Sequence, residues 1–214
     1  MLDAGTGRGD LALHFSRLKR GWCVRGIDID QERVDHCSTA ARALEIEGVK
    51  FDRLDLLDLE SSGQYDLISS TDVLEHIQDD QRALSNMARA LKPGGYLVLT
   101  FPSVPGRHHL RLLTWLERRK GSARGVFGHV REGYSPEGIR DLLEQVSLET
   151  ALVRSTYGFF GTLAHDIFYI IGDSEVNPFV FGLALPFLLA LSFIEGHTST
   201  RHGSALLVVA AKRK

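Results

Sequence analysis

Several residue types that mark whole protein classes are scarce in this sequence. Cysteine occurs twice among 214 residues, at Cys23 and Cys37, a spacing that fits no metal motif and no disulfide framework. The net charge is −2, so neither sign of charge is in excess. The overall charge therefore gives no electrostatic case for nucleic-acid binding. We therefore expect a reduced, cytoplasmic setting, no metal centre and no nucleic-acid partner.

A glycine-rich turn near the start lacks two familiar signatures. Its spacing, Gly5-Thr6-Gly7-Arg8-Gly9, is not the G-x-G-x-x-G of dinucleotide sites, and no Gly-Lys-Ser/Thr ending marks a P-loop. Asp3 lies just before the first glycine, where a carboxylate would repel a pyrophosphate but suit a ligand that carries an ammonium group. The turn predicts a strand, a tight bend and a helix N-terminus that together bind a small ligand.

A second acid follows the next predicted strand. Asp28 lies roughly 20 residues beyond the glycine turn, where a carboxylate can accept two hydrogen bonds from the vicinal diol of a ribose. The alternative for Asp28 is a solvated acid at a strand end. Asp30 is better suited to capping the helix that Gln31 begins.

The quoted residues resemble motif I of the class I S-adenosylmethionine (SAM) methyltransferases, (D/E)-x-G-x-G-x-G, and the later motifs follow in the expected order as far as Pro102. The run Asp72-Val73-Leu74-Glu75-His76-Ile77 is similar to the motif after strand four in small-molecule methyltransferases of the ubiquinone-biosynthesis type. The resemblance implies SAM as the cofactor, held by Asp3, Gly5, Thr6, Gly7, Gly9, Asp28, Ile29, Asp55, Leu56 and Thr71. Asp58 is the rival of Asp55 for the adenine amino group.

The alternation of predicted strands and helices indicates an α/β fold, with a doubly wound, mostly parallel, seven-stranded Rossmann-like sheet. Helices are predicted over 10–19, 31–47, 80–91 and 136–146, and a reversed last strand over 205–210 is expected beside a strand over 148–157. We expect one domain, 1–214, made of a SAM-binding core (1–102), a basic insertion or lid (103–135) and a C-terminal half with apolar cap helices (136–214).

Three residues are candidates for handling the acceptor. His76 has a pKa suited to a general base, although the alternative is a structural histidine that bonds backbone. His129 and Tyr134 belong to a His-x-Arg-x-x-Tyr-Ser run that resembles the segment over the acceptor pocket in the same group of enzymes. No Asn/Asp-Pro-Pro-Tyr/Phe block follows strand four and no Pro-Cys pair occurs, which argues against methylation of nucleic-acid bases.

The C-terminal third holds a long uncharged run. Residues 178–194 carry no charge, and as a helix they would extend about 25 Å, a little less than the ~30 Å core of a bilayer. Three alternatives remain open for this run: a soluble cap over the acceptor pocket, interfacial contact with a membrane, or a spanning helix. The basic insertion has two interpretations, a solvated lid face or a surface for an anionic substrate or lipid.

The resemblance thus implies a SAM-dependent methyltransferase that acts on a small-molecule or lipid-linked acceptor at oxygen, with carbon and nitrogen as the alternatives. Such an enzyme aligns donor and acceptor and excludes water, so no strong catalytic triad is required. The alternatives are a SAM-binding protein without turnover that acts as a membrane or partner scaffold, and a nicotinamide-dependent oxidoreductase. We expect a cytoplasmic protein, with peripheral membrane association as the alternative.

Overall fold

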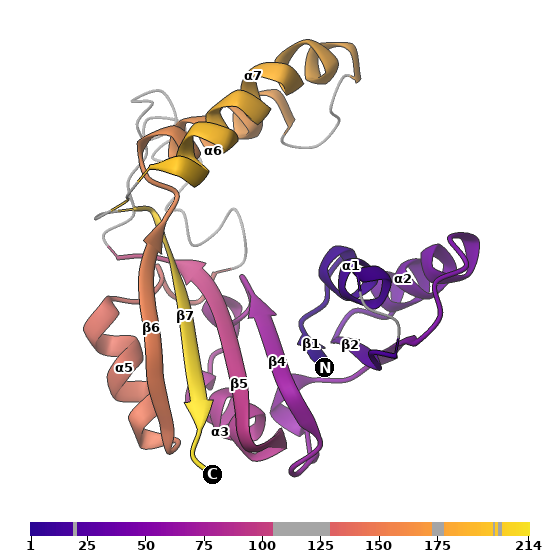
Figure 1. The fold of residues 1–214 in the computed structure, drawn as a ribbon, viewed down its shortest axis with the longest axis vertical. Helices are drawn as coiled ribbons and strands as arrows, with labels where there is room; N and C mark the ends of the chain where they lie inside the picture. Colours follow the sequence, from indigo (N-terminus) through magenta and orange to yellow (C-terminus); the bar gives the residue numbers. More distant parts are fainter. Residues whose placement is uncertain (19–20, 105–128, 173–177, 199, 201–202) are drawn as a thin grey trace.

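The computed structural model describes residues 1–18, 21–104, 129–172, 178–198, 200 and 203–214. Within this part of the chain seven strands form one sheet in the order β3-β2-β1-β4-β5-β7-β6, and β7 is antiparallel to both of its neighbours (Figure 1). The predicted sheet and its reversed last strand are therefore confirmed. Residues 105–128, which hold most of the expected basic insertion, lie outside the described residues, so the lid and the internal division of the domain remain predictions.

The strands and helices alternate from the start of the chain. The strands are β1 (Leu2–Ala4), β2 (Val24–Asp28), β3 (Val49–Arg53), β4 (Tyr65–Thr71), β5 (Leu91–Pro102), β6 (Leu148–Thr156) and β7 (Ala205–Lys212). The helices are α1 (Asp10–Leu18), α2 (Gln31–Ala43), α3 (Asp80–Ala90), α5 (Pro136–Gln145), α6 (Phe159–Gly172) and α7 (Pro178–His197), with short 3-10 turns η1 (Leu56–Asp58) and η2 (Leu74–His76).

The second helix ends earlier than the sequence predicts. The prediction placed its end at Glu47 because Gly48 follows, but Glu45 adopts a left-handed conformation with φ of 52° and stops α2 at Ala43. The amide of Ile46 then donates to the carbonyl of Ala41 at 2.9 Å, which closes the helix end. Gly48 has a different constraint, since a Cβ there would lie 2.7 Å from the carbonyl oxygen of Trp22.

The main core lies under the centre of the sheet. Leu2, Ile68 and Leu97 come from three neighbouring strands and are fully buried, as expected for strands covered on both faces. This packing fixes the carboxyl ends of β1, β4 and β5 side by side. Ligands bind beyond those ends in open α/β sheets.

The helices α6 and α7 form a hairpin that stands beyond the carboxyl ends of β4, β5 and β6 (Figure 1). The hairpin has a small core of its own, in which Ala164 meets Leu188 and Leu191. One stripe of α7 thus packs on α6, and only 11% of the stretch Phe179–His197 is buried. The expected cap is present as two helices, but α7 is not packed into the main domain.

Candidate active site

The glycine bend after β1 offers bare main chain to a ligand. Gly5, Gly7 and Gly9 have φ of 79°, 56° and 79°, the left-handed region that glycine tolerates. A Cβ on Gly5 would come within 2.3 Å of the Val73 side chain, so the bend packs closely against the chain after β4. A Cβ on Gly7 would meet nothing within 4 Å, so the backbone there is open to a bound molecule.

Asp3 lies buried beneath the bend. Its carboxylate accepts hydrogen bonds from the hydroxyls of Thr6 at 2.7 Å and Ser69 at 2.9 Å. Burial raises the pKa of Asp3, and a cationic group nearby would restore its ionised form. Thr6 therefore orients the acid, and the pair suits the ammonium end of an amino acid.

Asp28 ties the bend to the end of β2. One carboxylate oxygen accepts from the amide of Gly7 at 2.9 Å and the other from the amide of Asp30 at 3.0 Å. Each oxygen keeps a second lone pair, so the fixed carboxylate can still accept from a diol. Asp30 caps α2 through the amide of Glu32, as predicted, and Ile29 between them is 61% exposed, an apolar side chain at the ligand edge.

The acid after β3 stands beside Asp28, because the amide of Leu54 donates to the Asp28 carbonyl at 2.9 Å. Asp55 is half-buried and caps η1 through the amide of Leu57. Asp58 is exposed and faces Arg82 of α3 at 3.5 Å. This placement favours Asp55 over its rival as the acid nearest the predicted adenine position.

The two remaining residues of the predicted cofactor set differ in exposure. Leu56 is buried in the main core, and Thr71 is exposed at the carboxyl end of β4, opposite Thr100 of β5. Every residue of the predicted set thus lies at or just beyond the carboxyl ends of β1 to β4. A ligand that extends from the glycine bend towards β3 would meet them in order.

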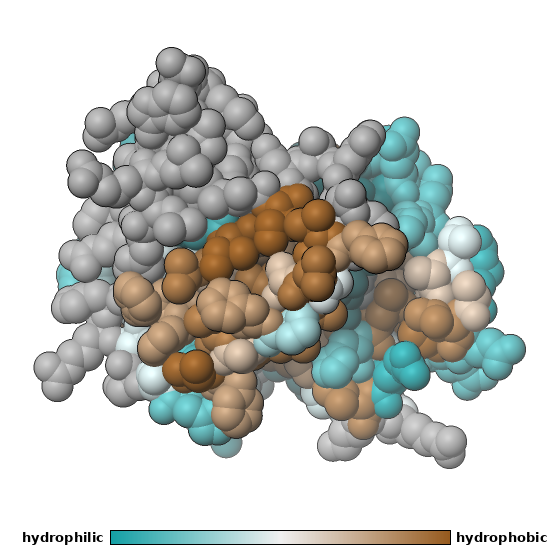
Figure 2. Space-filling view, turned by 90° about the horizontal axis from the view of Figure 1, so that it is seen from above, coloured by the Kyte–Doolittle hydropathy of each residue, from teal (hydrophilic) through white to brown (hydrophobic). Residues whose placement is uncertain are grey.

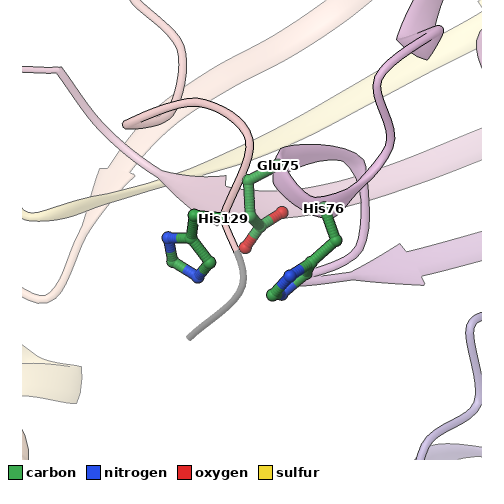
Figure 3. A group of neighbouring side chains, drawn as sticks. All are labelled: Glu75, His76 and His129. Atoms are coloured by element: carbon green, nitrogen blue, oxygen red, sulfur yellow. The ribbon is translucent and has the colours of Figure 1, made fainter. Parts of the chain in front are cut away.

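Three side chains gather beyond β4 and β5, and the carboxylate of Glu75 lies between the rings of His76 and His129 (Figure 3). The ring centroids of the two histidines are 4.7 Å apart, and the candidate ligand atoms of the three residues lie within 4.8 Å of one another. The amide of Val130 donates to the Glu75 carbonyl at 2.9 Å, which fastens the chain that carries His129 onto η2. We call this group the Glu75 cluster.

The Glu75 cluster has unusual electrostatics. Glu75 is fully buried, and its carboxylate oxygens make no hydrogen bond within the described residues. Burial raises the pKa of Glu75 to about 7, and burial lowers the pKa of His129. A neutral imidazole is thereby favoured at His129 near neutral pH, which is the form that accepts a proton. One carboxylate and two imidazoles are also a donor set that can hold a divalent metal ion, which the sequence did not predict.

Tyr134 supports the segment that carries His129. Its buried hydroxyl donates to Asp80 at 2.7 Å, and burial raises the pKa of Tyr134. Asp80 also forms an ion pair with Arg131, whose guanidinium donates to the carbonyls of Ile77 and Gln78. The hydroxyl of Tyr134 is thus engaged in a network that positions its neighbours, and an acceptor-binding role for it remains a prediction.

Sequence reasoning missed four polar residues near this edge: Asp72, Glu75, Tyr157 and His165. Asp72 has a φ of 52°, and burial raises its pKa, while the charges of His165 and His76 act in the opposite direction. The ring of Tyr157 contacts the ring of His165 edge-on, with centroids 6.1 Å apart. Asp72 and Glu75 belong to the quoted run after β4, so the run itself was the available signal. His165 is a polar residue in an apolar segment, which gave no specific signal.

The sheet order, the glycine bend and the row of acids at the carboxyl edge are those of an α/β protein with a site for an adenosine-containing cofactor. The model of the "Methyltransferase domain" family matches residues 1–152, so the chain belongs to that family. It is a SAM-dependent small-molecule methyltransferase. The enzyme class and the cofactor predicted from the sequence are confirmed.

Relatives with a known activity are distant. The chain is 24% identical over 182 residues to a ubiquinone biosynthesis O-methyltransferase of Rickettsia bellii, which covers 85% of this chain and 73% of that protein. It is 34% identical over 101 residues to the ajmaline N-methyltransferase of Rauvolfia serpentina, covering 46% of this chain and 34% of that protein.

Solved structures share the fold. Phosphoethanolamine N-methyltransferase 2 of Haemonchus contortus, in complex with S-adenosyl-L-methionine, matches with a TM-score of 0.69 and 20% identity. The match covers 100% of this chain and 48% of that chain. At this level of identity the likeness shows the fold alone.

Proposed function

We propose that this enzyme methylates a hydroxyl oxygen of a small-molecule or lipid-linked acceptor, and that His129 accepts the hydroxyl proton. The observation that carries the proposal is the Glu75 cluster, in which two imidazoles and a buried carboxylate meet beyond β4 and β5. A hydroxyl is a weak nucleophile until a base removes its proton, whereas the methyl donor needs no activation by the protein.

The residues of the cofactor set fit SAM. When bound, SAM supplies a methyl carbon whose bond to sulfur breaks as the acceptor oxygen bonds to that carbon. Asp3 would hold the ammonium end and Asp28 the ribose diol, and both carboxylates are already fixed by hydrogen bonds. Such preorganisation aligns the donor with little further loss of conformational freedom.

The chain's own part in the reaction is proton transfer. The hydroxyl proton passes to a ring nitrogen of His129, and the electron pair that it leaves behind forms the new bond to carbon. The Glu75 carboxyl lies beside that ring (Figure 3) and, in its ionised form, offsets the positive charge of the imidazolium that results.

The relatives support an oxygen acceptor and also define a second candidate. The relative that aligns with 85% of this chain is named an O-methyltransferase of ubiquinone biosynthesis. The relative with the higher identity, over 101 residues, is named an N-methyltransferase of ajmaline. An amine is therefore the second candidate acceptor, and it too would have to lose a proton.

The test compares two probes and two histidine variants. Initial rates are measured with SAM and either a catechol, with and without an apolar chain, or a secondary amine. We expect turnover of the catechol, a fall in kcat of roughly 100-fold for His129→Gln, and an unchanged Kd for SAM. His36→Gln, a change at an exposed histidine of α2, is the matched control and should leave kcat unchanged. Methylation of the amine alone, or an unaltered kcat in His129→Gln, would reject the proposal.

A further inference from the structure

The outward side of α7 is an apolar surface that the described part of the chain leaves uncovered. Phe179 is 84% exposed, Leu183 81% and Phe193 69%, and further apolar side chains of α7 are exposed between and beside them. Figure 2 looks down on this end of the molecule, where apolar residues gather across the middle of the face. We call this the α7 surface and define it by Phe179, Val180, Leu183, Leu185, Phe187, Leu189, Phe193 and Ile194.

Among the described residues, only one stripe of α7 is buried, and it packs against α6. Leu188 and Leu191 are buried against α6, with Phe181 and Ala184 partly buried on the same stripe. The exposed residues cover the remaining circumference, so the helix has no polar face along its middle. An ordinary surface helix carries charged residues opposite its buried stripe, and here that side is apolar too.

The charged group of α7 lies at the base of the hairpin, next to the sheet. Glu195 accepts hydrogen bonds from the amides of Gly158 at 2.6 Å and Gly161 at 3.1 Å, and from the hydroxyl of Thr200 at 2.9 Å. These bonds fasten the end of α7 to the start of α6 and hold the hairpin closed. The carboxylate therefore serves the fold and does not interrupt the α7 surface.

We propose that the α7 surface docks on a lipid bilayer and lies in its interfacial layer. A protein partner or a second copy covers one face and meets a polar rim, whereas this helix is apolar on both flanks and bears no charged residue from 178 to 194. A surrounding lipid medium covers such a helix on all its exposed sides. The docking does not rest on the oxygen acceptor or on His129.

The hairpin is not built to cross the membrane. The strands β6 and β7, which lead into it and out of it, are neighbours in one sheet, so both of its ends return to the same side. With 14 residues α6 extends about 21 Å, less than the ~30 Å core of a bilayer. It also carries Asp166, which is fully buried. The hairpin therefore lies on one leaflet while the sheet stays in water.

Docking in this way would bring the acceptor site to the lipid surface. The hairpin stands beyond the carboxyl ends of the strands that hold the site (Figure 1), and His165 of α6 interacts with Asp72 after β4. An acceptor that partitions into lipid could then reach the site from the membrane without crossing bulk water.

The test uses the full chain and vesicles of phosphatidylcholine, alone or mixed with phosphatidylglycerol. We expect the protein to float with both kinds of vesicle, and the double variant Phe179→Glu/Leu183→Glu to lower the bound fraction roughly tenfold or more. Leu44→Glu, at a residue 56% exposed beyond α2, is the matched control and should float like the unaltered chain. Retained binding of SAM shows that each variant is folded.

A fluorescent label reports the docking directly. In a Cys23→Ser background, an environment-sensitive dye on Leu183→Cys should shift to shorter wavelength when vesicles are added, and a dye on Leu44→Cys should not. The proposal is overturned if the unaltered chain stays in the soluble fraction with both vesicle types. It is also overturned if the double variant Phe179→Glu/Leu183→Glu floats as well as the control Leu44→Glu. It is also overturned if the α7 surface instead forms a dimer in solution that the double variant abolishes and vesicles do not compete.

Discussion

Replacing Glu75 by glutamine should change how the stability of the enzyme depends on pH. Glu75 is fully buried, its carboxylate has no hydrogen-bond partner among the described residues, and burial raises its pKa from 4.5 to about 7. Between these two values the folded state holds a proton on this group that the unfolded state has released. The free energy of unfolding must therefore fall as pH rises through this range.

The magnitude follows from the size of the pKa shift. At 1.36 kcal/mol for each pKa unit, the rise from 4.5 to about 7 corresponds to about 3 kcal/mol in favour of unfolding once the pH exceeds 7. Glutamine carries no proton to lose and avoids this penalty. From pH 5 to pH 8 the free energy of unfolding of Glu75→Gln, minus that of the unaltered enzyme, should increase by about 2.5 kcal/mol.

Urea unfolding followed by circular dichroism at several pH values measures this difference. Glu60→Gln changes an exposed glutamate in the same way and should give a difference that does not vary with pH. Parallel curves of stability against pH for Glu75→Gln and the unaltered enzyme would refute the argument. They would show that the carboxyl is solvated or paired in the folded protein.

Further substitutions test the other contacts. Gly5→Ala should destabilise the fold by about 1–3 kcal/mol in urea unfolding, since its Cβ would meet Val73 at 2.3 Å and its φ is 79°; a loss below 0.5 kcal/mol would mean that the bend is loose. Asp55→Asn should raise the calorimetric Kd for SAM while Asp58→Asn leaves it unchanged, and the reverse order would reassign the adenine contact. Asp80→Asn should cost about 3 kcal/mol in urea unfolding because it leaves a partly buried guanidinium without its carboxylate, and an unchanged midpoint would contradict that.

The fold, and the place of the predicted cofactor residues at the carboxyl ends of the strands, could be predicted from the sequence because the signals are local. Asp3 and the glycines are neighbours in the chain. The alternation of strands and helices allows few sheet orders in which Asp28 would lie away from the glycine bend. The end of α2 was mispredicted because Glu45, a non-glycine residue, takes the left-handed conformation that glycine usually supplies.

The Glu75 cluster was not predictable, because His129 is more than fifty residues from its partners in the chain. It forms only when β4 and β5 pair and the amide of Val130 binds the Glu75 carbonyl. The sequence likewise identified the uncharged run after Pro178 but could not say which side of it stays exposed. That answer depends on how closely α7 packs on α6.

Calorimetric titration of SAM into the unaltered enzyme and into Asp28→Asn tests the central claim most directly, that the glycine bend and the acid after β2 hold this cofactor. We expect SAM to bind with one site per chain, NAD to show no heat of binding, and Asp28→Asn to raise the Kd for SAM by roughly tenfold or more. Binding of NAD without SAM, or an equal affinity for SAM in Asp28→Asn, would contradict the account.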